Sequence, residues 1–298
     1  MAEIPTSPLS ASDGERVDVV IVTRNRARDL LRTLDHLQRL PERPRVIVVD
    51  NSSTDATCAL VTSNHHEVSL VALRENVGAA ARTIGVEHAR APYVAFCDDD
   101  SWWEPGALTA AADLFERFLH LAVIAARVLV GESAAIDPTC ELMAASPIPA
   151  RRPLPGPPVL GFIACGAVVR RDAYLQVGGF HRQFGIGGEE QLLALDLVSA
   201  GWDLAYVDSL VAYHHPSPVR DLERRRIIVT RNVLWSAWLR LSLGAAARRT
   251  WDIIARLPRD PAARSGLLAA LEGVPWIVRE RRRLAPSVEA DFELLPNG

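Results

Sequence analysis

Three consecutive aspartates, Asp98, Asp99 and Asp100, are the residues with the clearest potential for chemistry. They follow the short apolar run 92–97, whose β-branched and aromatic residues predict a buried strand rather than a helix. Adjacent carboxylates repel one another, so this aspartate triple at a strand's carboxyl end indicates a cation, or the metal of a phosphate-bearing ligand, that neutralises it. We therefore expect a pocket around this point.

Two further predicted strands also end in polar groups. The run Val17–Thr23 leads into Arg24 and Asn25, and residues 45–49 lead into Asp50 and Asn51. Ligands of open parallel sheets bind beyond the carboxyl ends of the strands. Asp50 could accept the ring N–H of a nucleotide base, and the aspartate triple could hold a divalent cation on a diphosphate. An aspartate at a strand end is also a common cap or turn residue, so the combination is more specific than either part.

The segments around these strand ends alternate between strand and helix patterns. Helical spacing of leucines covers 30–40, and further helices are expected over 53–66, 76–88 and 104–118, with a third strand at 68–73. Strand-helix-strand repeats of this length predict an α/β fold with a mostly parallel central sheet and helices on both faces.

The second half of the chain has a less regular pattern. Strands are expected at 123–130, 161–170, 202–207 and 211–213, a helix at 189–200, and a long proline-rich loop at 131–158. From residue 219 onward the pattern is helical only. We therefore expect a disordered leader at 1–16, an α/β domain at 17–218 and a C-terminal helical region at 219–298.

Composition narrows the possible functions. All 33 basic residues are arginine, which excludes mechanisms that need a lysine amine. The four cysteines form no CxxC pair, so they are expected to be reduced in a cytoplasmic protein without a zinc site. No apolar run approaches the roughly 18 residues that span a bilayer. We expect no nucleic-acid partner.

The net charge of −3 conceals an asymmetry along the chain. Residues 219–298 hold 15 Arg against 9 Asp and Glu, which leaves the rest of the chain acidic. Trp235, Trp238 and Trp251 lie on amphipathic stretches of the same region. A basic, tryptophan-containing tail predicts contact with an anionic partner or peripheral attachment to the inner face of the cell membrane. Solvated helix faces are the alternative explanation.

The ordered motifs of the chain resemble those of the family 2 glycosyltransferases, which have the GT-A fold. The matching segments are 19–25, 48–55, 76–78 with Arg82, the aspartate triple, 177–180, 188–190 and His214. The resemblance covers about residues 17–215. It implies a GT-A domain followed by a C-terminal helical appendage, and an enzyme that transfers a sugar from a nucleoside-diphosphate sugar of UDP, dTDP or GDP type.

The resemblance also assigns roles to individual residues. It implies a nucleotide-sugar site formed by Thr23, Arg24, Asn25, Asp50, Asp55, Asn76, Gly78, Arg82, Asp98 and Asp99. It implies that Mn²⁺ or Mg²⁺ is bound by Asp98, Asp100 and His214, with Asp100 as the likeliest direct ligand. The metal would stabilise the departing diphosphate while a base removes the acceptor's hydroxyl proton, so that one direct displacement inverts the anomeric centre.

The expected base lies at Glu189 and Glu190, hereafter the Glu pair. The family usually reads Glu-Asp at these positions, so this chain departs from it by one methylene. Glu190 is assigned as the base, with Glu189 as the alternative, because either carboxylate is competent to accept a proton. Acid enrichment in the first turn of a helix would explain the pair without catalysis.

The acceptor side of the site is less defined. Trp102 and Trp103 could stack on a sugar ring or pack the following helix. Cys165 and Gly166 lie in a run of small residues that would permit close approach of an acceptor, although packing alone explains them equally well. The acceptor itself stays open between bacterial envelope polysaccharide, glycolipid and natural product, and homo-oligomerisation is left open.

Other functions compete with this prediction. A nucleotidyltransferase would carry a glycine-rich loop with Arg and Lys after the first strand, where this chain has residues 23–26 without either Gly or Lys. A dinucleotide dehydrogenase is disfavoured because no GxGxxG follows that strand. A non-catalytic module that keeps the fold and binds sugar nucleotides is the remaining alternative, since the Glu pair departs from the family pattern.

Overall fold

A computed structural model of the chain describes residues 13–217 and 222–295. Most of the predicted leader lies outside these residues, and its end forms the short helix α1 (Asp13–Arg16). Arg16 Nη2 lies 2.6 Å from Asp113 Oδ1 and 3.0 Å from Glu116 Oε1. The described part of the predicted leader is therefore ordered and attached to the domain.

The first half of the domain alternates strands with helices, as the sequence predicted. Its elements are β1 (Val17–Thr23), α2 (Ala27–Gln38), β2 (Val46–Asp50), α3 (Thr57–Asn64), β3 (Ser69–Ala72), the 3-10 helix η1 (Gly78–Ala80), α4 (Ala81–His88) and β4 (Tyr93–Asp98). The predicted strands of this half are all present, with ends that differ by at most a residue or two.

The second half departs more from the predicted pattern. Its elements are β5 (Ser101–Trp103), α5 (Ala107–Arg117), β6 (Leu121–Val130), β7 (Ala135–Ile136), α6 (Pro138–Ala144), the 3-10 helix η2 (Ala164–Gly166), β8 (Ala167–Arg170), α7 (Arg171–Gln176), α8 (Glu189–Ser199) and β9 (Asp203–His214).

Three predictions for this half were wrong. The segment 131–158 is not one long loop, because it contains β7 and the helix α6, which Asp137 caps by accepting the N–H of Thr139. The strands predicted at 202–207 and 211–213 are a single strand, β9, which has a register shift against β6. The strand predicted at 161–170 begins only at Ala167, because η2 precedes it.

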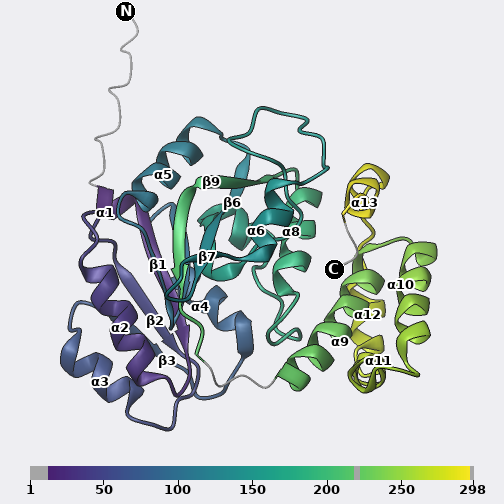
Figure 1. Cartoon of the computed structure of the whole chain (residues 1–298), viewed down its shortest axis with the longest axis horizontal. Coiled ribbons are helices and arrows are strands. Elements are labelled where there is room, and N and C mark those ends of the chain that lie inside the picture. The colour runs from purple at the N-terminus through teal and green to yellow at the C-terminus, as the bar shows by residue number, and fades with distance from the viewer. Residues whose placement is uncertain (1–12, 218–221, 296–298) are drawn as a thin grey trace, which may run out of the picture.

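One nine-stranded sheet organises the domain. The strand order is β3-β2-β1-β4-β8-β6-β9-β5, and β7 pairs with β6. The pairs β2–β3, β1–β2, β1–β4 and β6–β9 are parallel, whereas β8, β5 and β7 join the sheet antiparallel. The sheet is thus mostly parallel, which confirms the predicted fold class, and Figure 1 shows its strands crossing the centre of the domain.

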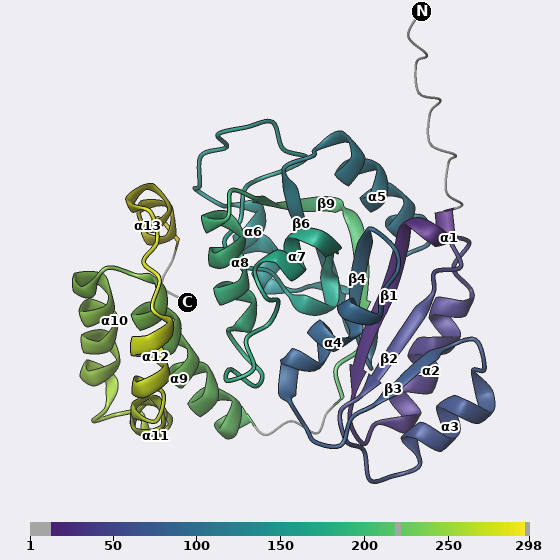
Figure 2. The ribbon, with the colours of Figure 1, turned by 180° about the vertical axis from the view of Figure 1, so that it is seen from behind.

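Both faces of the sheet are buried, which explains why the strands read as continuous apolar runs rather than as alternating ones. On β1, Val20 belongs to the hydrophobic core on one face, whereas Val19 and Ile21 belong to the core on the other. The first core also contains residues of α4 and α8, and the second contains residues of α2 and α5. Figure 2 shows these helices from the opposite side.

The C-terminal region forms a helical group beside α8 (Figure 1). Its helices are α9 (Leu222–Arg240), α10 (Leu243–Arg256), α11 (Pro261–Leu271), α12 (Val274–Glu280) and α13 (Pro286–Glu293). Trp235 and Trp276 of this group share one core with Phe184 and with Leu192 of α8. The appendage is therefore packed onto the domain rather than tethered to it.

Candidate active site

The register of the parallel strands β1, β2 and β4 brings their polar ends together. Thr23 pairs with Asp50, and Val22 pairs with Asp98. Because neighbouring strands lie about 4.8 Å apart, Asp50 and Asp98 are separated by roughly 10 Å along one edge of the sheet. The predicted convergence of strand ends is present, and its spacing suits a ligand with two polar ends.

Asp50 provides a buried acceptor at this edge. The side chain is 2% exposed, and its Oδ2 accepts the backbone N–H of Ser53 at 2.9 Å. Its Oδ1 is buried and has no hydrogen-bond partner within the described ranges. The nearby Cys58 thiol is a weak donor, and burial together with the Asp50 charge raises its pKa to about 11. Asp50 is therefore a buried acceptor at the sheet edge, and its contact with the ring N–H of a base stays a prediction.

Asn25 joins the loops that follow β1 and β2. Its backbone N–H donates to Ser53 Oγ (2.9 Å), and its Oδ1 accepts the N–H of Thr54 (2.7 Å). Asn25 has a φ of 54°, a left-handed conformation that asparagine tolerates better than most residues. Asn25 therefore shapes the wall beside Asp50, whereas Arg24 is exposed next to it.

Asp55 lies at the beginning of α3. Its Oδ1 accepts hydrogen bonds from the Thr57 N–H (3.0 Å) and hydroxyl (2.5 Å). The hydroxyl bond is the main reason why the pKa of Asp55 is below its ordinary value. The carboxylate is exposed and acts as a local cap for the helix, so its contact with a nucleotide stays a prediction.

The predicted loop 76–78 is held from two sides. The Asn51 side chain accepts the N–H of Val77 (2.9 Å) and donates to the carbonyl of Gly78 (3.0 Å). Asn76 Oδ1 accepts the Gly78 N–H (3.0 Å). Gly78 has a φ of 64°, and a Cβ there would lie 2.7 Å from the Cα of Gly185. Glycine is therefore required where this loop meets the loop that leads to α8.

Arg82 supplies a buried positive charge to the same edge. Its guanidinium donates from Nη2 to Asp98 Oδ1 and lies over the Phe180 ring. Burial lowers the pKa of Arg82, but Asp98, Glu189 and Glu190 raise it by more, so the side chain stays charged. Its buried Nε has no partner in the part of the chain that the structure describes, and the expected contact of Arg82 with a nucleotide sugar stays a prediction.

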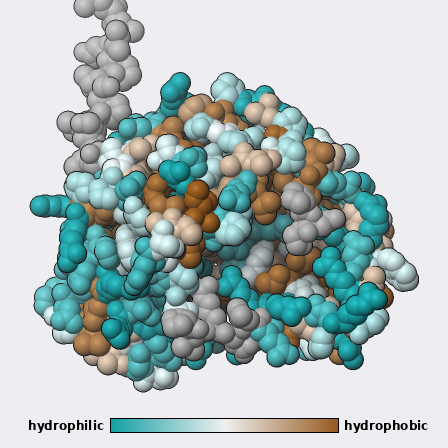
Figure 3. Space-filling model, in the orientation of Figure 1, coloured by the Kyte–Doolittle hydropathy of each residue, from teal (hydrophilic) through white to brown (hydrophobic). Residues whose placement is uncertain are grey.

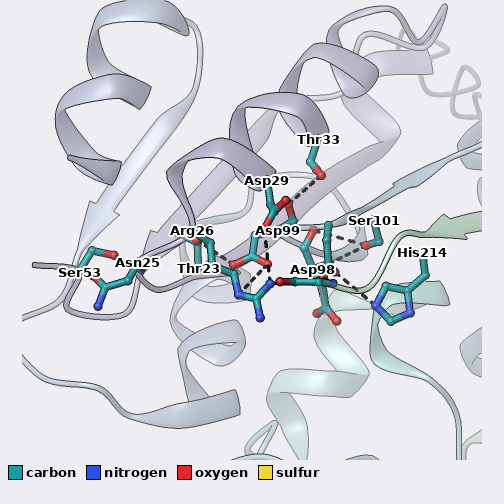
Figure 4. Close-up of polar contacts among 12 residues, drawn as sticks. Thr23, Asn25, Arg26, Asp29, Thr33, Ser53, Asp98, Asp99, Ser101 and His214 are labelled. Carbon is teal, nitrogen blue, oxygen red and sulfur yellow. Dashed lines mark hydrogen bonds and ion pairs between the residues drawn. The ribbon is translucent and has the colours of Figure 1, made fainter. Parts of the chain in front are cut away.

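The aspartate triple divides into one accessible carboxylate and two buried ones. The Asp98 side chain is 34% exposed. Asp99 Oδ2 accepts the Thr23 hydroxyl (3.0 Å), and its carbonyl accepts the Thr33 hydroxyl (2.9 Å). Burial and then the charge of Asp100 raise the pKa of Asp99 to about 7. Asp99 therefore supports the turn after β4, as Figure 4 shows.

Asp100 is engaged by the protein itself. Its Oδ1 lies 3.3 Å from His214 Nε2, and its Oδ2 accepts the Ser217 N–H at 3.2 Å. Burial opposes its ionisation, but the hydrogen bond to His214, with help from Ser217 and Arg26, holds the pKa of Asp100 below its ordinary value. Arg26 Nη1 lies 3.6 Å from Asp100 Oδ2 (Figure 4). Arg26 is a site residue that the sequence analysis missed, although it directly follows Asn25.

Three side chains at the ends of different elements form a candidate metal site. Asp98, Cys165 and His214 each offer one donor atom, and these atoms all lie within 4.8 Å of one another. Within residues 13–217 and 222–295 this is the one group of three or more His, Cys, Asp or Glu so arranged. Carboxylate and imidazole donors suit Mn²⁺, so the residues fit a divalent cation.

Two of the three expected metal ligands, Asp98 and His214, lie in this donor group. Asp100 contacts the group, with its Oδ1 3.3 Å from His214 Nε2, and its expected role as a direct ligand stays a prediction. Cys165, which was expected on the acceptor side, stands in the donor group instead.

The Glu pair begins α8 on the same side of the molecule. Glu189 is 2% exposed, and its Oε2 accepts the N–H of Gly187, so it folds back on its own loop. Glu190 is half-buried and lies within electrostatic reach of Arg82 and Asp98. Burial raises the pKa of both glutamates, with the charge of Glu190 contributing for Glu189. The arrangement leaves Glu190 as the accessible member of the pair.

The helix α9 holds the loop that leads to the Glu pair. Asn232, which is fully buried, donates from Nδ2 to the carbonyls of Phe184 (2.9 Å) and Gly187 (2.5 Å). Arg231 Nη2 donates to the same Phe184 carbonyl (2.7 Å). Helical periodicity does not reveal which distant loop a helix packs against, so these two residues could not be identified from the sequence.

The two tryptophans after the aspartate triple have different surroundings. Trp103 is 1% exposed, and its indole N–H donates to the carbonyl of Phe96 (3.2 Å), so it packs the core. Trp102 is half-buried and stacks on His36, with ring centroids 3.9 Å apart, and on His215. Trp103 therefore packs inside the domain, which is the second of the two roles that the sequence allowed. The Trp102 ring already stacks on aromatic side chains of the chain itself, and its contact with a sugar ring stays a prediction.

Fold and site together define a class of protein. The carboxyl edge of the mostly parallel sheet carries the buried acceptor Asp50 and the metal donor group, and Glu190 lies nearby at the start of α8. Ligands of such sheets bind at this edge, and the arrangement is that of a sugar transferase of the GT-A fold. The profile of Glycosyl transferase family 2 matches residues 18–178, more than half of the chain. The chain therefore belongs to glycosyl transferase family 2, which confirms the predicted family and enzyme class.

Individual relatives agree with this membership. The N-acetylglucosaminyl-diphospho-decaprenol L-rhamnosyltransferase of Mycobacterium tuberculosis is 27% identical over 231 residues, which cover 66% of this chain and 75% of that protein. The mannosyltransferase PcManGT from Pyrobaculum calidifontis, solved in complex with GDP-Man and Mn²⁺, has a TM-score of 0.59 and 19% identity over 93% of this chain and 74% of its own.

A second solved structure gives the same result. S. aureus TarS in complex with UDP-GlcNAc has a TM-score of 0.58 and 15% identity, and the match covers 94% of this chain and 82% of that one. At such identities the likeness shows the fold alone, and it confirms the predicted GT-A fold.

Proposed function

We propose that this family 2 glycosyltransferase transfers a sugar from a nucleoside-diphosphate sugar to a hydroxyl acceptor by a single inverting displacement with Mn²⁺ or Mg²⁺ bound. The proposal rests on one observation, the convergence of the buried Asp50 carboxylate, the metal donor group and Glu190 around one edge of the sheet. The complexes of PcManGT with GDP-Man and Mn²⁺, and of TarS with UDP-GlcNAc, support this donor class.

The donor would lie along the sheet edge. Asp50 accepts the ring N–H of the base, and the roughly 10 Å between Asp50 and Asp98 accommodates the ribose. Asp98 and His214 hold the cation, which when bound offsets the charge that develops on the leaving diphosphate. The free Nε of Arg82 donates to the donor's phosphate or sugar oxygens.

Glu190 acts as the general base in this scheme. As the acceptor oxygen attacks the anomeric carbon, its proton passes to the Glu190 carboxylate, and the bond between the anomeric carbon and the diphosphate oxygen breaks. Two features favour Glu190 over Glu189. Glu190 is half-buried whereas Glu189 is buried, and the carboxylate of Glu189 already accepts the Gly187 N–H. A base must reach the proton that it abstracts.

The acceptor is proposed to be a lipid-linked diphosphate sugar at a membrane surface. The similar protein from M. tuberculosis is named for such an acceptor, decaprenol diphosphate carrying N-acetylglucosamine, and for rhamnose as the transferred sugar. None of the helices in the described ranges is long and apolar enough to cross a bilayer. The arginines and exposed apolar side chains of the C-terminal helices suit a peripheral contact with such a surface.

Donor binding tests the proposal directly. Calorimetric titration of the full chain with UDP, dTDP and GDP in the presence of Mn²⁺ should show metal-dependent binding of one of them. Asp50→Ala should weaken that binding, because the base loses its acceptor. Asp172→Ala, which removes an aspartate at the start of α7, is the control and should leave the affinity unchanged. If none of the three diphosphates binds, the proposed donor class is wrong.

A further inference from the structure

The metal donor group includes a sulfur atom, that of Cys165, in addition to the oxygen of Asp98 and the nitrogen of His214. Asp98 ends β4, His214 ends β9 and Cys165 lies in η2, which packs against both of these strands. The three donor atoms come from segments far apart in sequence and still lie within 4.8 Å of one another. Convergence of this kind is what a metal site requires.

The position of Cys165 is fixed by close packing of the turn that carries it. Gly166, the next residue, is buried, and a Cβ there would lie 2.4 Å from Val128 Cγ2 on β6. Only glycine lets η2 approach the sheet so closely, and this packing leaves Cys165 2% exposed beside the strand ends. The small residues at 165–166 thus serve the approach of η2 to the sheet.

The environment of the Cys165 sulfur differs from that of another buried cysteine. Cys140 Sγ accepts the N–H of Val128 (3.2 Å) and donates to the carbonyl of Ala126. Cys165 is a free, buried thiol whose sulfur lies within 4.8 Å of a carboxylate oxygen of Asp98 and an imidazole nitrogen of His214. A buried thiol in this setting is available for coordination.

The other two members of the group are already oriented by partners behind them. Asp98 Oδ1 accepts from Arg82, and His214 is paired with Asp100 at 3.3 Å. The contact between Asp100 and the His214 imidazole helps to fix the ring that offers the donor nitrogen. The site therefore has both a set of donors and the groups that hold them.

We propose that Cys165 is a direct ligand of the catalytic metal, so that the centre has one oxygen, one nitrogen and one sulfur donor from the protein. This inference rests on the proposed function only in placing the donor diphosphate at the same metal. A thiolate donor favours Co²⁺, Zn²⁺ and Cd²⁺ over Mg²⁺. The thiol proton leaves to the buffer as the sulfur–metal bond forms.

Cobalt provides a readout that does not depend on turnover. Titration of the metal-free full chain with Co²⁺ should produce a near-ultraviolet thiolate-to-cobalt charge-transfer band that saturates at one Co²⁺ per chain. Cys165→Ser should abolish the band, and Cys140→Ser, the matched buried-cysteine control, should retain it. Absence of the band from the unmodified chain, or its persistence in Cys165→Ser, overturns the inference.

A second measurement covers the case in which Cys165→Ser does not fold. In the unmodified chain, Cd²⁺ should slow alkylation of Cys165 at least tenfold, as read by mass spectrometry of the peptides, while alkylation of Cys58 is unchanged. Equal alkylation with and without Cd²⁺ contradicts the inference. Diphosphate binding with Mn²⁺ is measured separately, so failure of the cysteine ligand and failure of the proposed donor class give different results.

Discussion

At the scale of single residues, the two glutamates of the pair make a matched comparison. Glu190→Gln removes the proposed base but keeps its volume, so kcat should fall by on the order of 10²–10⁴. Binding of the nucleoside diphosphate with Mn²⁺ should stay within about twofold, because the donor does not need the base. Steady-state turnover and calorimetry on the same preparations provide both numbers.

Glu189→Gln serves as the control for this prediction. Its Oε2 accepts only the N–H of Gly187 within the described residues, so an amide oxygen can replace it. Most of the turnover should therefore survive in Glu189→Gln. If Glu189→Gln loses activity and Glu190→Gln retains it, the base is Glu189 and the assignment made from exposure is wrong.

The pH dependence of the reaction follows from the environment of Glu190. Burial raises the pKa of this carboxyl above its ordinary value of 4.5. A base is active only when deprotonated, so kcat/KM should fall as pH decreases through this raised pKa, and the acid limb should lie above the range of an exposed glutamate. A profile of kcat/KM from about pH 3.5 to 8 checks this. An acid limb at about 4.5 or lower would contradict a buried base.

At the scale of elements, α9 is the support of the catalytic loop. Asn232→Ala removes two hydrogen bonds to the carbonyls of Phe184 and Gly187. Arg231 would still donate to the Phe184 carbonyl, but the Gly187 carbonyl would lose its Asn232 donor, which costs about 1–3 kcal/mol of unfolding free energy. The loop should also lose its fixed position, so kcat should fall roughly tenfold or more, because positioning errors of about 1 Å have effects of this order.

The control for this prediction is an exposed amide of similar type. Asn64 Nδ2 donates to the carbonyl of Leu60 at the end of α3, away from the loop. Asn64→Ala should leave both stability and kcat nearly unchanged. Denaturant unfolding and turnover separate the two effects. A loss of stability in Asn232→Ala with normal kcat would show that the loop finds its position without α9.

The sequence predicted the first half of the fold well because its signals are local. β-Branched runs such as Val17–Thr23 and leucine spacing in α2 are each sufficient to define one element. The antiparallel strands β5 and β7 are two or three residues long, too short for any periodicity, and their pairing depends on distant partners. They could therefore be found only in the folded chain.

The candidate site was likewise predictable only where a local sequence pattern marked a residue. Asp98 follows directly from the end of a predicted strand, whereas Glu190 was assigned through the resemblance to family 2 glycosyltransferases, because a helix start alone would also explain an acidic residue there. The presence of Cys165 beside Asp98 and His214 in the donor group depends on how η2 packs against β6, which no local pattern encodes. Arg26 and Asn232 act through side-chain contacts between segments that are distant in sequence, so their roles also required the structure.

At the scale of the whole molecule, the C-terminal helices have two roles that must be separated. Trp235 and Trp276 complete a core with Phe184 and Leu192. Deletion of the region would expose this core and release the loop before α8, so a truncated chain cannot report on membrane attachment alone. Substitutions on the outer surface of these helices avoid this difficulty.

The outer surface of these helices is unusually apolar as well as basic. Eight of the twelve exposed large hydrophobic side chains of the described residues lie there: Leu243, Trp251, Ile254, Leu268, Leu271, Val274, Val278 and Leu294. On the face shown in Figure 3, hydrophilic residues predominate and hydrophobic ones form separate patches. Arginines such as Arg248 and Arg279 accompany them on the same helices. Dispersed apolar side chains among arginines suit a shallow, reversible contact with anionic lipid.

Vesicle binding of the full chain tests this contact. Flotation with anionic vesicles should be strong at low salt and should weaken as ionic strength rises, because the attraction between arginines and headgroups is screened. Trp251→Ser combined with Val278→Ser should weaken it several-fold, since these side chains, 68% and 73% exposed, would be the ones inserted. Leu119→Ser, at an equally exposed apolar position before β6, should leave binding unchanged. Equal flotation of all three proteins, or flotation with zwitterionic vesicles alone, would show that the C-terminal surface is not the attachment site, and the acceptor would then have to reach the active site without a membrane.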